Sequence, residues 1–420
     1  MTQASWNIAI YTILLASFLL NWIIEWLNVK NASRPVPDEI AGLYDDEKYQ
    51  KSQSYLIDQS RFGIVESTFT LGVLILAKET GLIGQLDAVT KEIFSLENVI
   101  LWGVLFFGLL GLASLILNLP FQIYSTFVLE EKYGFNRTTP KVFMLDLLKS
   151  ALLGVLVGGP VLYAVLWLLG AMGSYGWLYA WIFVVGMQLL LSYLAPHWIM
   201  PLFNKFTRLE NGELRDSIER YASSQNFELS EIYMMDGSKR SSKANAFFTG
   251  LGNRKRIVLF DTLVEKQSTA ELVSVLAHEI GHFKMKHIPR QLVLGVFTTG
   301  VMFYVLSVVM GNQSLVATFG FAEASVHASL FVFAIVYSPV SQILGVLRMY
   351  FSRKYEFEAD DFAVRTCNSG VTLESALRKL SQDNLSNLTP HPLKVFLEYS
   401  HPPLVDRVKA IRAINSRLSL

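Results

Sequence analysis

The chain has 420 residues and a mass of 47.3 kDa; 52% of its residues are hydrophobic and 17% are charged. This balance, with a mean hydropathy of +0.36, excludes a wholly soluble or disordered protein. The formal net charge is +1, from 36 basic and 35 acidic residues, so we expect no nucleic-acid partner. The one cysteine, Cys367, excludes an internal disulfide and a cysteine-based cluster, so any metal must be held by His, Asp or Glu.

Seven apolar stretches are each long enough to cross a bilayer, whose core of about 30 Å needs roughly 20 helical residues. They are, in chain order, approximately Asn7–Leu27, Arg61–Gly81, Val99–Phe121, Leu148–Leu169, Trp177–Tyr193, Gln291–Met310 and His327–Leu347. A buried soluble helix could explain one such stretch but not seven, so we predict a mainly α-helical, multi-pass membrane protein. The first stretch has no basic region before it and no small-residue cleavage site, which favours a span over a signal peptide.

Lysine and arginine predict the orientation, because short positively charged loops stay in the cytoplasm. The loops after the first and third spans and the two long polar segments are rich in both residues, whereas the N-terminus and the loops after the fourth and sixth spans have neither. We therefore expect the N-terminus outside and the C-terminus in the cytoplasm. The predicted parts are spans one to five in 1–202, polar segment 203–290, spans six and seven in 291–347, and polar segment 348–420. The two polar segments should form one discontinuous cytoplasmic domain.

Within the first polar segment, residues Ala244–Phe260 contain two apolar runs around a Gly-Leu-Gly-Asn turn, which predicts a β-hairpin. Ser268 and Glu271 then form a capping box ahead of an apolar run, so a helix should begin there. Its buried side is predicted to carry a set of aliphatic residues at helical spacing, namely Leu272, Val275, Leu276 and Ile280.

This helix also carries His278-Glu279-x-x-His282. On a helix the two imidazoles lie one turn apart on one face, with a carboxylate beside them, and this arrangement is typical of a zinc site with a general base. A helix with two unrelated histidines is the alternative. Gly281 costs about 1 kcal/mol relative to alanine inside a helix, which suggests that another segment approaches closely there.

A catalytic zinc takes three protein ligands, so a third donor must lie elsewhere in the chain. The acidic segment 353–361 directly follows the seventh predicted span, which brings it to the cytoplasmic face. On a helix Glu356 and Asp360 share one face, while Glu358 points away. A solvated charged helix end is the alternative. Next to two histidines that need a carboxylate, the segment favours Glu356 as ligand and Asp360 as the partner that orients a histidine.

The sequence resembles the type I CAAX prenyl endopeptidases, which are integral membrane zinc metalloproteases. Besides the two-histidine motif, the resemblance rests on short sequences that keep the family's order, at 130–136, 201–206, 243–248, 355–360 and 400–407. It implies seven transmembrane helices around an intramembrane chamber, with a zincin-like α+β metalloprotease domain on the cytoplasmic side. It also implies the cytoplasmic membrane as location in a bacterium, or the endoplasmic reticulum in a eukaryote.

The resemblance further implies roles for eight residues. The ligands of one Zn²⁺ per chain would be His278, His282 and Glu356. The catalytic residues would be Glu279, as general base, and His401, as oxyanion donor. Asn245 would bind substrate, and Asp360 and Arg407 would lie around the ligands. Zinc activates water and polarises a carbonyl, and Glu279 would move the proton. As alternatives, Asn245 is a turn residue and His401 a surface loop histidine. Arg407 is expected near His401 or paired with Asp360.

Other histidines are predicted to have no catalytic role. His287 lies about 140° round the helix from His282 and cannot join the ligand face. His197 and His327 are interpreted as interfacial or loop residues, and His391 is left unassigned.

Glu25 and Glu66 lie at membrane depth, where ionisable groups are costly, and are expected to line the chamber. For Glu25, a position at the interface is the alternative.

The leading hypothesis is a zinc endopeptidase that cuts near the C-terminus of prenylated or membrane-associated peptides, with the lipid bilayer as its other partner. One alternative is a membrane quality-control metalloprotease of the heat-shock type, whose members have about four spans. A further alternative is a non-enzymatic membrane protein stabilised by zinc. Three ligands with a spare carboxylate favour an open catalytic site over this last reading.

Overall fold

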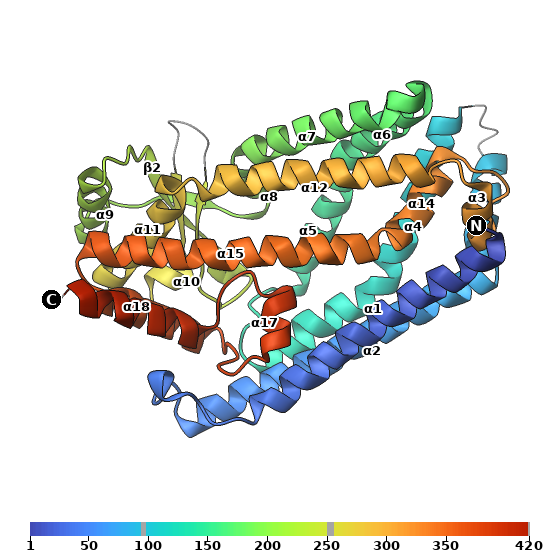
Figure 1. Cartoon of the computed structure of the whole chain (residues 1–420). Coiled ribbons are helices and arrows are strands. Elements are labelled where there is room, and N and C mark those ends of the chain that lie inside the picture. The colour runs from blue at the N-terminus through green and yellow to red at the C-terminus, as the bar shows by residue number, and fades with distance from the viewer. Residues whose placement is uncertain (94–97, 250–255, 419–420) are drawn as a thin grey trace.

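The computed structural model describes residues 1–93, 98–249 and 256–418. Long helices run side by side along most of the molecule, and a domain with a small sheet lies at one end (Figure 1). The N-terminus and the C-terminus lie at opposite ends of the molecule (Figure 1). Up to Phe203 the helical segments are α1 (Gln3–Ala32), η1 (Asp38–Ile40), α2 (Asp46–Glu79), α3 (Leu82–Ile93), α4 (Val99–Tyr124), η2 (Ser125–Glu130), α5 (Pro140–Leu153), η3 (Gly154–Gly158), α6 (Gly159–Ala171), η4 (Gly173–Tyr175), α7 (Gly176–Leu194), η5 (Ala195–Ile199) and α8 (Met200–Phe203).

The rest of the chain alternates between the small domain and two further membrane segments. Its strands are β1 (Phe206–Arg208), β2 (Glu231–Met235), β3 (Ala246–Thr249) and β4 (Arg256–Phe260). Its helical segments are α9 (Glu213–Ser224), η6 (Gly237–Lys239), α10 (Asp261–Val264), α11 (Thr269–Lys284), α12 (His287–Val309), α13 (Gln313–Val316), η7 (Ala317–Phe319), α14 (Val326–Val336), α15 (Ser338–Cys367), α16 (Val371–Asp383), α17 (Pro392–Glu398) and α18 (Leu404–Leu418).

Six helical segments of the described chain are long and apolar enough to cross a membrane, and a seventh span arises if the bent pair α14 and α15 counts as one. The prediction of a multi-pass helical membrane protein is thus confirmed. The seventh stretch was wrong in one respect: it is not one straight helix, because the chain bends by 57° between Val336 and Ser338. Pro339 explains the bend, since its ring prevents the regular hydrogen bond and collides with the preceding turn.

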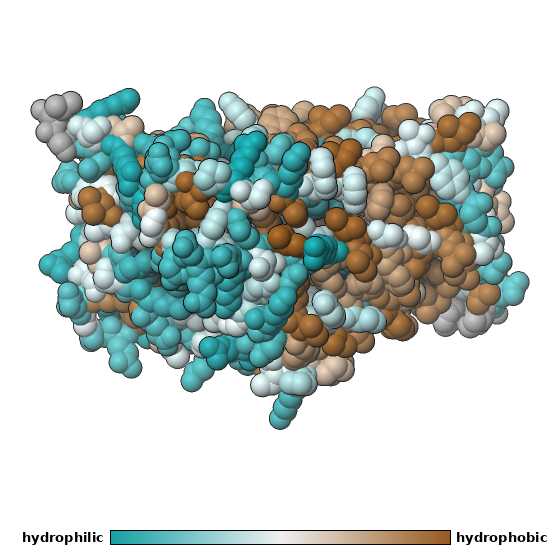
Figure 2. Space-filling model, turned by 90° about the horizontal axis from the view of Figure 1, so that it is seen from below, coloured by the Kyte–Doolittle hydropathy of each residue, from teal (hydrophilic) through white to brown (hydrophobic). Residues whose placement is uncertain are grey.

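Prolines also account for local departures from α-helix within the spans. The π-helical segments η3 and η5 lie beside Pro160 and Pro196, each of which removes a backbone donor from the regular ladder. The surface of the spans is apolar: in Figure 2 hydrophobic residues cover one half of the visible face, and hydrophilic residues cover the half that holds the small domain. A belt of apolar surface of this kind is what a bilayer requires.

The small domain is built on a four-stranded sheet with the order β1-β2-β4-β3, in which β3 is an edge strand. The predicted hairpin is confirmed: β3 and β4 pair antiparallel, with Phe247 opposite Val258. Its turn, 250–255, lies outside the described residues. The capping box of Ser268 and Glu271 is present at the start of α11.

One face of the sheet packs on α11. Leu272, Leu276 and Ile280 are buried there as predicted, whereas Val275 is half-buried. A second cluster joins Ala277 of α11 to Ala363, Val364, Leu373 and Ile411 from the second polar segment. Residues of the two polar segments, which are separated in sequence by membrane helices, therefore pack in one cluster.

Candidate metal centre and active site

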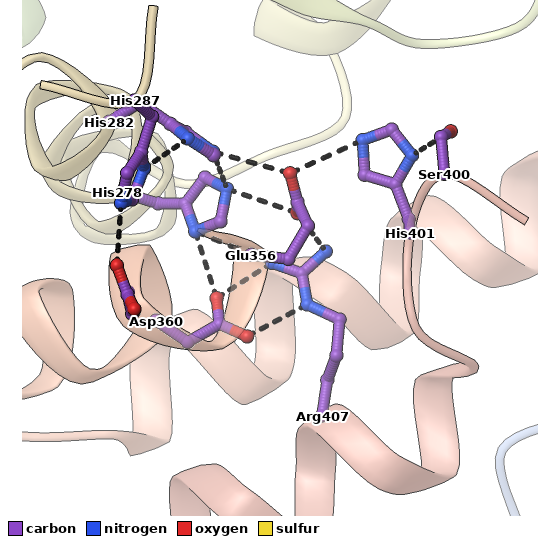
Figure 3. A network of polar contacts seen from close by, with 9 residues as sticks. His278, His282, His287, Glu356, Asp360, Ser400, His401 and Arg407 are labelled. Atoms are coloured by element: carbon purple, nitrogen blue, oxygen red, sulfur yellow. Dashed lines mark hydrogen bonds and ion pairs between the residues drawn. The ribbon is translucent and has the colours of Figure 1, made fainter. Parts of the chain in front are cut away.

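His278 and His282 of α11 meet Glu356 of α15 in one compact cluster (Figure 3). The Nε2 atoms of the two histidines are 3.1 Å apart. Glu356 places Oε1 3.2 Å from His282 Nε2 and Oε2 3.4 Å from His278 Nε2. One donor atom from each residue lies within 4.8 Å of the others. The predicted trio is thus brought together from two helices, although Glu356 lies 74 residues after His282 in the sequence.

Gly281 allows this approach of the two helices. A Cβ atom at Gly281 would lie 3.2 Å from both the Cα and the carbonyl oxygen of Ala359 on α15. Ala359 is itself fully buried, so α11 and α15 meet at two small residues. The close approach predicted from a glycine inside a helix is confirmed, and it carries Glu356 to the histidines.

Asp360 fixes the orientation of His278. Its Oδ1 lies 2.8 Å from His278 Nδ1, and both groups are buried. An Nδ1–H that donates to this carboxylate leaves Nε2 unprotonated and directed at the cluster. Arg407 of α18 holds Asp360 from the other side, with Nε 2.8 Å from Oδ2 and a terminal nitrogen 2.7 Å from Oδ1. Of the two positions expected for Arg407, the structure therefore has the one that pairs with Asp360.

The electrostatic environment of the cluster favours a cation. Burial disfavours a charged imidazole, yet the hydrogen bonds to Asp360 and Glu356 outweigh it and raise the pKa of His278 to about 9. The pKa of Arg407 is raised as well, since burial is outweighed by Asp360 and Glu356. Two buried carboxylates thus supply more negative charge than Arg407 balances. A divalent cation at Nε2 of His278 would be attracted by the same two carboxylates that favour a proton on this imidazole.

The donor set fits a transition-metal ion. Ligands about 2.0–2.1 Å from a tetrahedral zinc lie roughly 3.3–3.4 Å from one another. The two imidazole nitrogens here are 3.1 Å apart, and each has a different oxygen of Glu356 as its neighbour, at 3.2 Å for His282 and 3.4 Å for His278. Glu356 Oε2 is buried without a hydrogen-bond partner among the described residues, although Arg407 Nη1 lies 3.3 Å away at ion-pair distance. A metal ion would satisfy this oxygen more fully. Two imidazoles and a carboxylate leave a fourth coordination position for water or substrate.

His401 reaches the edge of the cluster from the loop between α17 and α18. Its Nε2 lies 3.5 Å from Glu356 Oε1, and its Nδ1 lies 2.9 Å from Ser400 Oγ (Figure 3). The side chain is 64% exposed. His401 is therefore a surface loop histidine, and it also places a polar group at the exposed side of the His-His-Glu cluster.

Glu279 and Asn245 lie on elements that flank the cluster. Glu279 is half-buried, next to His278 on α11, and its negative charge contributes to the raised pKa of Arg407. Asn245 is exposed and directly precedes the edge strand β3; its side-chain oxygen accepts a hydrogen bond of 2.8 Å from Ala246 N. The carbonyl oxygen of Asn245 accepts from Phe260 N at 3.2 Å, which ties it to β4.

His287 lies outside the ligand trio, as predicted, yet it touches one ligand. Its Nδ1 is 2.9 Å from Nδ1 of His282, its Nε2 is 2.9 Å from Glu358 Oε2, and its ring stacks on Tyr355. This contact was missed because Lys286 adopts a left-handed conformation, φ 60°, that ends α11 and turns the next histidine back. A helix extrapolated through Lys286 puts His287 on the wrong side.

Helix α17 supports the His401 loop, and sequence reasoning did not find this support. Arg353, three residues before Glu356, donates at 2.7 Å to the carbonyl oxygens of Val395 and Tyr399, at the end of α17. Lys394 of α17 pairs with Glu25 of α1. Glu25 is thus tied to the helix that supports the His401 loop, and its carboxylate also accepts from Ser60 at 2.7 Å.

The remaining histidines differ from the sequence interpretation in part. His327 is not a loop residue: it is 1% exposed, begins the buried part of α14, and places Nε2 2.7 Å from Asp87 Oδ1. The error arose because an apolar boundary position does not reveal a partner on α3. His197 lies in η5 and is half-buried, and His391 caps α17 by accepting from Leu393 N. Glu66 is half-buried within α2.

Comparison with known proteins covers nearly the whole chain. The family described as "CAAX prenyl protease N-terminal, five membrane helices" matches residues 5–205, and "Peptidase family M48" matches residues 208–415. A CAAX prenyl protease 1 homolog of Oryza sativa subsp. japonica is 36% identical, over 91% of each chain. The probable CAAX prenyl protease 1 of Schizosaccharomyces pombe is 40% identical, over 89% of this chain and 81% of the relative. The crystal structure of S. mikatae Ste24p aligns with a TM-score of 0.92 at 32% identity, over 97% of this chain and 99% of the other.

Apolar spans, a small sheet and a His-His-Glu cluster on two helices define an integral membrane metalloendopeptidase. The chain belongs to peptidase family M48, as a homologue of the CAAX prenyl protease 1 enzymes.

Proposed function

We propose that this peptidase holds one Zn²⁺ per chain on His278, His282 and Glu356 and cleaves near the C-terminus of prenylated, CAAX-type protein tails. The observation that carries the metal is the convergence of three donor atoms, with Asp360 orienting one histidine. The similarity to proteins named CAAX prenyl proteases, extending over both the membrane helices and the small domain, supports the substrate class.

The chain's own residues divide the chemistry as follows. When bound, zinc supplies Lewis-acid polarisation of the scissile carbonyl and of the attacking water. Glu279 removes the proton of that water as the new carbon–oxygen bond forms. It then delivers the proton to the leaving nitrogen as the carbon–nitrogen bond breaks. His401 donates from Nε2 to the oxygen on which negative charge develops.

Asn245 and β3 are proposed to hold the substrate. An extended peptide can add to the free edge of β3, where main-chain hydrogen bonds fix its register. Asn245 is exposed at the start of this edge, and its side-chain amide nitrogen, which has no hydrogen-bond partner among the described residues, would bind the peptide backbone. Such binding presents a tail in extended form, which suits a chain terminus that has no fold of its own.

We also propose that the N-terminus lies outside and the C-terminus in the cytoplasm, and that the spans enclose a chamber. The positions of the two termini at opposite ends and the distribution of basic loops support this orientation. Cysteines at Ser5 and Ser416, in a Cys367→Ser background, test it with an impermeant thiol reagent. Ser5→Cys should react in intact cells and Ser416→Cys only after permeabilisation; the reverse pattern would overturn the orientation.

The function is tested with detergent-purified protein, a farnesylated C-terminal peptide and its unprenylated twin. Wild type should carry about one zinc per chain and cut the farnesylated peptide, whereas Glu279→Gln should keep the zinc and lose cleavage. Glu265→Gln, a change of an exposed glutamate in the same domain, serves as the matched control. Zinc without cleavage of either peptide would reject the prenylated substrate and favour a quality-control peptidase. Absence of stoichiometric zinc would reject the metal assignment.

A further inference from the structure

A cavity of about 340 Å³ lies where the last of the first five spans meets the sheet. Pro196 and Met200, from η5 and α8, form one wall, and Tyr233 and Phe247, from β2 and β3, form the other. Strand neighbours such as Ile257 point to the opposite face and belong to the core under α11. The cavity thus opens on the face of the sheet that α11 does not cover, away from the metal-binding helix.

Three basic side chains line this cavity, namely His197, Lys205 and Arg256. We call it the basic cavity. None has an acidic partner within ion-pair distance among the described residues. Arg256 lies over the ring of Tyr233 at 5.4 Å, and His197 engages the carbonyl oxygen of Tyr193 through Nδ1 at 3.1 Å, so its Nε2 stays available.

Two carboxylates lie near the cavity. Asp236 accepts from the backbone nitrogen of Lys205 at 2.7 Å. Glu231, the strand neighbour of Arg256, has Oε1 3.5 Å from Arg208, and its Oε2 is buried without a hydrogen-bond partner among the described residues. The side chains of Lys205 and Arg256 therefore line the cavity without an ion-pair partner in the part of the chain that the structure describes. A phosphate group, which accepts several charge-assisted hydrogen bonds at once, complements this arrangement.

The position of the basic cavity points to the source of the phosphate. It lies at the end of the span Gly173–Phe203, and the large aromatic residues Tyr193 and Trp198 beside it are 44% and 72% exposed. Exposed tyrosine and tryptophan at the end of a span mark the depth of the lipid headgroups. The apolar walls can contact the glycerol backbone and the first methylene groups of a lipid. A soluble phosphate would leave these walls uncovered.

We propose that the basic cavity binds the phosphate-bearing headgroup of an anionic phospholipid. Basic pockets at the cytoplasmic side of membrane helices have this specificity, and each basic side chain near the surface contributes about 1 kcal/mol, or about fivefold in affinity. Because Arg256 and Phe247 belong to β4 and β3, an occupied cavity also supports the hairpin whose edge is free. This binding is separate from peptide hydrolysis and does not depend on it.

Native mass spectrometry of the full chain, with dioleoyl phosphatidylinositol 4-phosphate and dioleoyl phosphatidylcholine as probes, tests the proposal directly. Wild type should retain the anionic lipid, and Lys205→Gln/Arg256→Gln should weaken its binding about 25-fold. Arg220→Gln/Arg417→Gln removes two exposed basic residues of the same domain that do not line the cavity, and should leave binding unchanged. A thermal unfolding scan and peptide cleavage in detergent establish that each variant is folded.

Three results would overturn the proposal. Equal retention of phosphatidylcholine, or equal weakening in both double variants, would mean that no specific headgroup site exists. Inorganic phosphate that competes with the lipid at a similar affinity would assign the cavity to a soluble anion. A raised KM for the peptide in Lys205→Gln/Arg256→Gln, with lipid binding unchanged, would make the cavity part of the substrate path.

Discussion

Two buried histidine–aspartate pairs lie at different places in this molecule, and they differ in what surrounds them. His278 pairs with Asp360 at 2.8 Å in the metal-binding cluster, and His327 pairs with Asp87 at 2.7 Å between α14 and α3. His278 uses Nδ1 and so directs Nε2 at two further donors, whereas His327 uses Nε2 itself. A buried histidine–aspartate pair can therefore contribute to a metal site only where the aspartate leaves Nε2 of the histidine free.

The neighbours of the two pairs reinforce the difference. Arg407 binds both oxygens of Asp360 and holds the carboxylate in place. Around His327 the neighbours are aromatic: Trp102 lies edge-on at 4.5 Å between ring centroids and Phe106 at 5.4 Å. The first pair is embedded in a polar network, and the second locks apolar helices together. The following predictions test this contrast, in order of decreasing effect.

Removal of each histidine should have opposite consequences. His278→Ala removes one of the three proposed ligands, so zinc and cleavage of a farnesylated peptide should both fall below detection. His327→Ala should keep zinc and cleavage at 20 °C but lower the free energy of unfolding by about 3–5 kcal/mol, because Asp87 is left buried without its partner. Metal analysis and thermal unfolding of both variants measure this. Zinc loss in His327→Ala would contradict the contrast.

Replacement of each aspartate is a milder form of the same test. Asp360→Asn should weaken zinc affinity about 10–100-fold, since the amide no longer favours the tautomer that leaves Nε2 free. Asp87→Asn should leave zinc affinity unchanged. Competition with a fluorescent chelator measures both affinities, and equal values for the two variants would refute the role given to Asp360.

Arg353 tests whether the His401 loop must be held by α15. Arg353→Gln removes three hydrogen bonds to the end of α17, so kcat should fall about tenfold while zinc content and KM stay close to wild type. Arg348→Gln, on the exposed side of the same helix, is the matched control. A loss of zinc in Arg353→Gln would show a structural role instead of a positioning one.

Glu271 is a buried carboxylate that has no histidine partner, and the expected effect of its protonation on stability is the smallest of those considered. Burial raises its pKa, but hydrogen bonds from Lys379, Ser375 and Ser268 outweigh burial and lower the pKa to about 2. In the unfolded chain its pKa is near 4.5, so the folded state binds fewer protons between these values. The stabilisation of about 1–3 kcal/mol is complete above pH 4.5 and is lost as the pH falls towards 2.

Unfolding of wild type and Glu271→Gln between pH 7 and pH 3 measures this contribution. The difference between the two free energies of unfolding should shrink as the pH falls below 4.5. A difference that stays constant over this range would mean that the carboxylate is not held in its charged form.

The sequence predicted those features that depend on local pattern. The spans follow from apolar length, the hairpin β3–β4 from two apolar runs around a turn, and the start of α11 from its capping box. His278 and His282 follow from helical spacing. Glu356 required one further step, because a two-histidine site needs a third donor and a span ends just before it.

The missed features depend on tertiary contacts that no local pattern carries. His327 finds its partner on α3, 240 residues away, and His287 turns back because Lys286 leaves the helix. In sequence Arg353 resembles any basic residue near a membrane boundary, and only the structure shows that it donates to the carbonyl oxygen of Val395 in α17. The bend at Pro339 was readable in principle, but the apolar pattern continues across it.

Helix α15 has a mechanical consequence. It runs without interruption from Ser338 at the bend to Glu356 and beyond, so Glu356 sits about 27 Å along a stiff rod, at about 1.5 Å per residue. A pivot of about 5° at the bend would move the carboxylate sideways by roughly 2 Å, more than half of its 3.2 Å separation from His282. Helix α15 is therefore a lever arm for Glu356, and the close packing of α11 on α15 at Gly281 and Ala359 leaves little room for such a displacement.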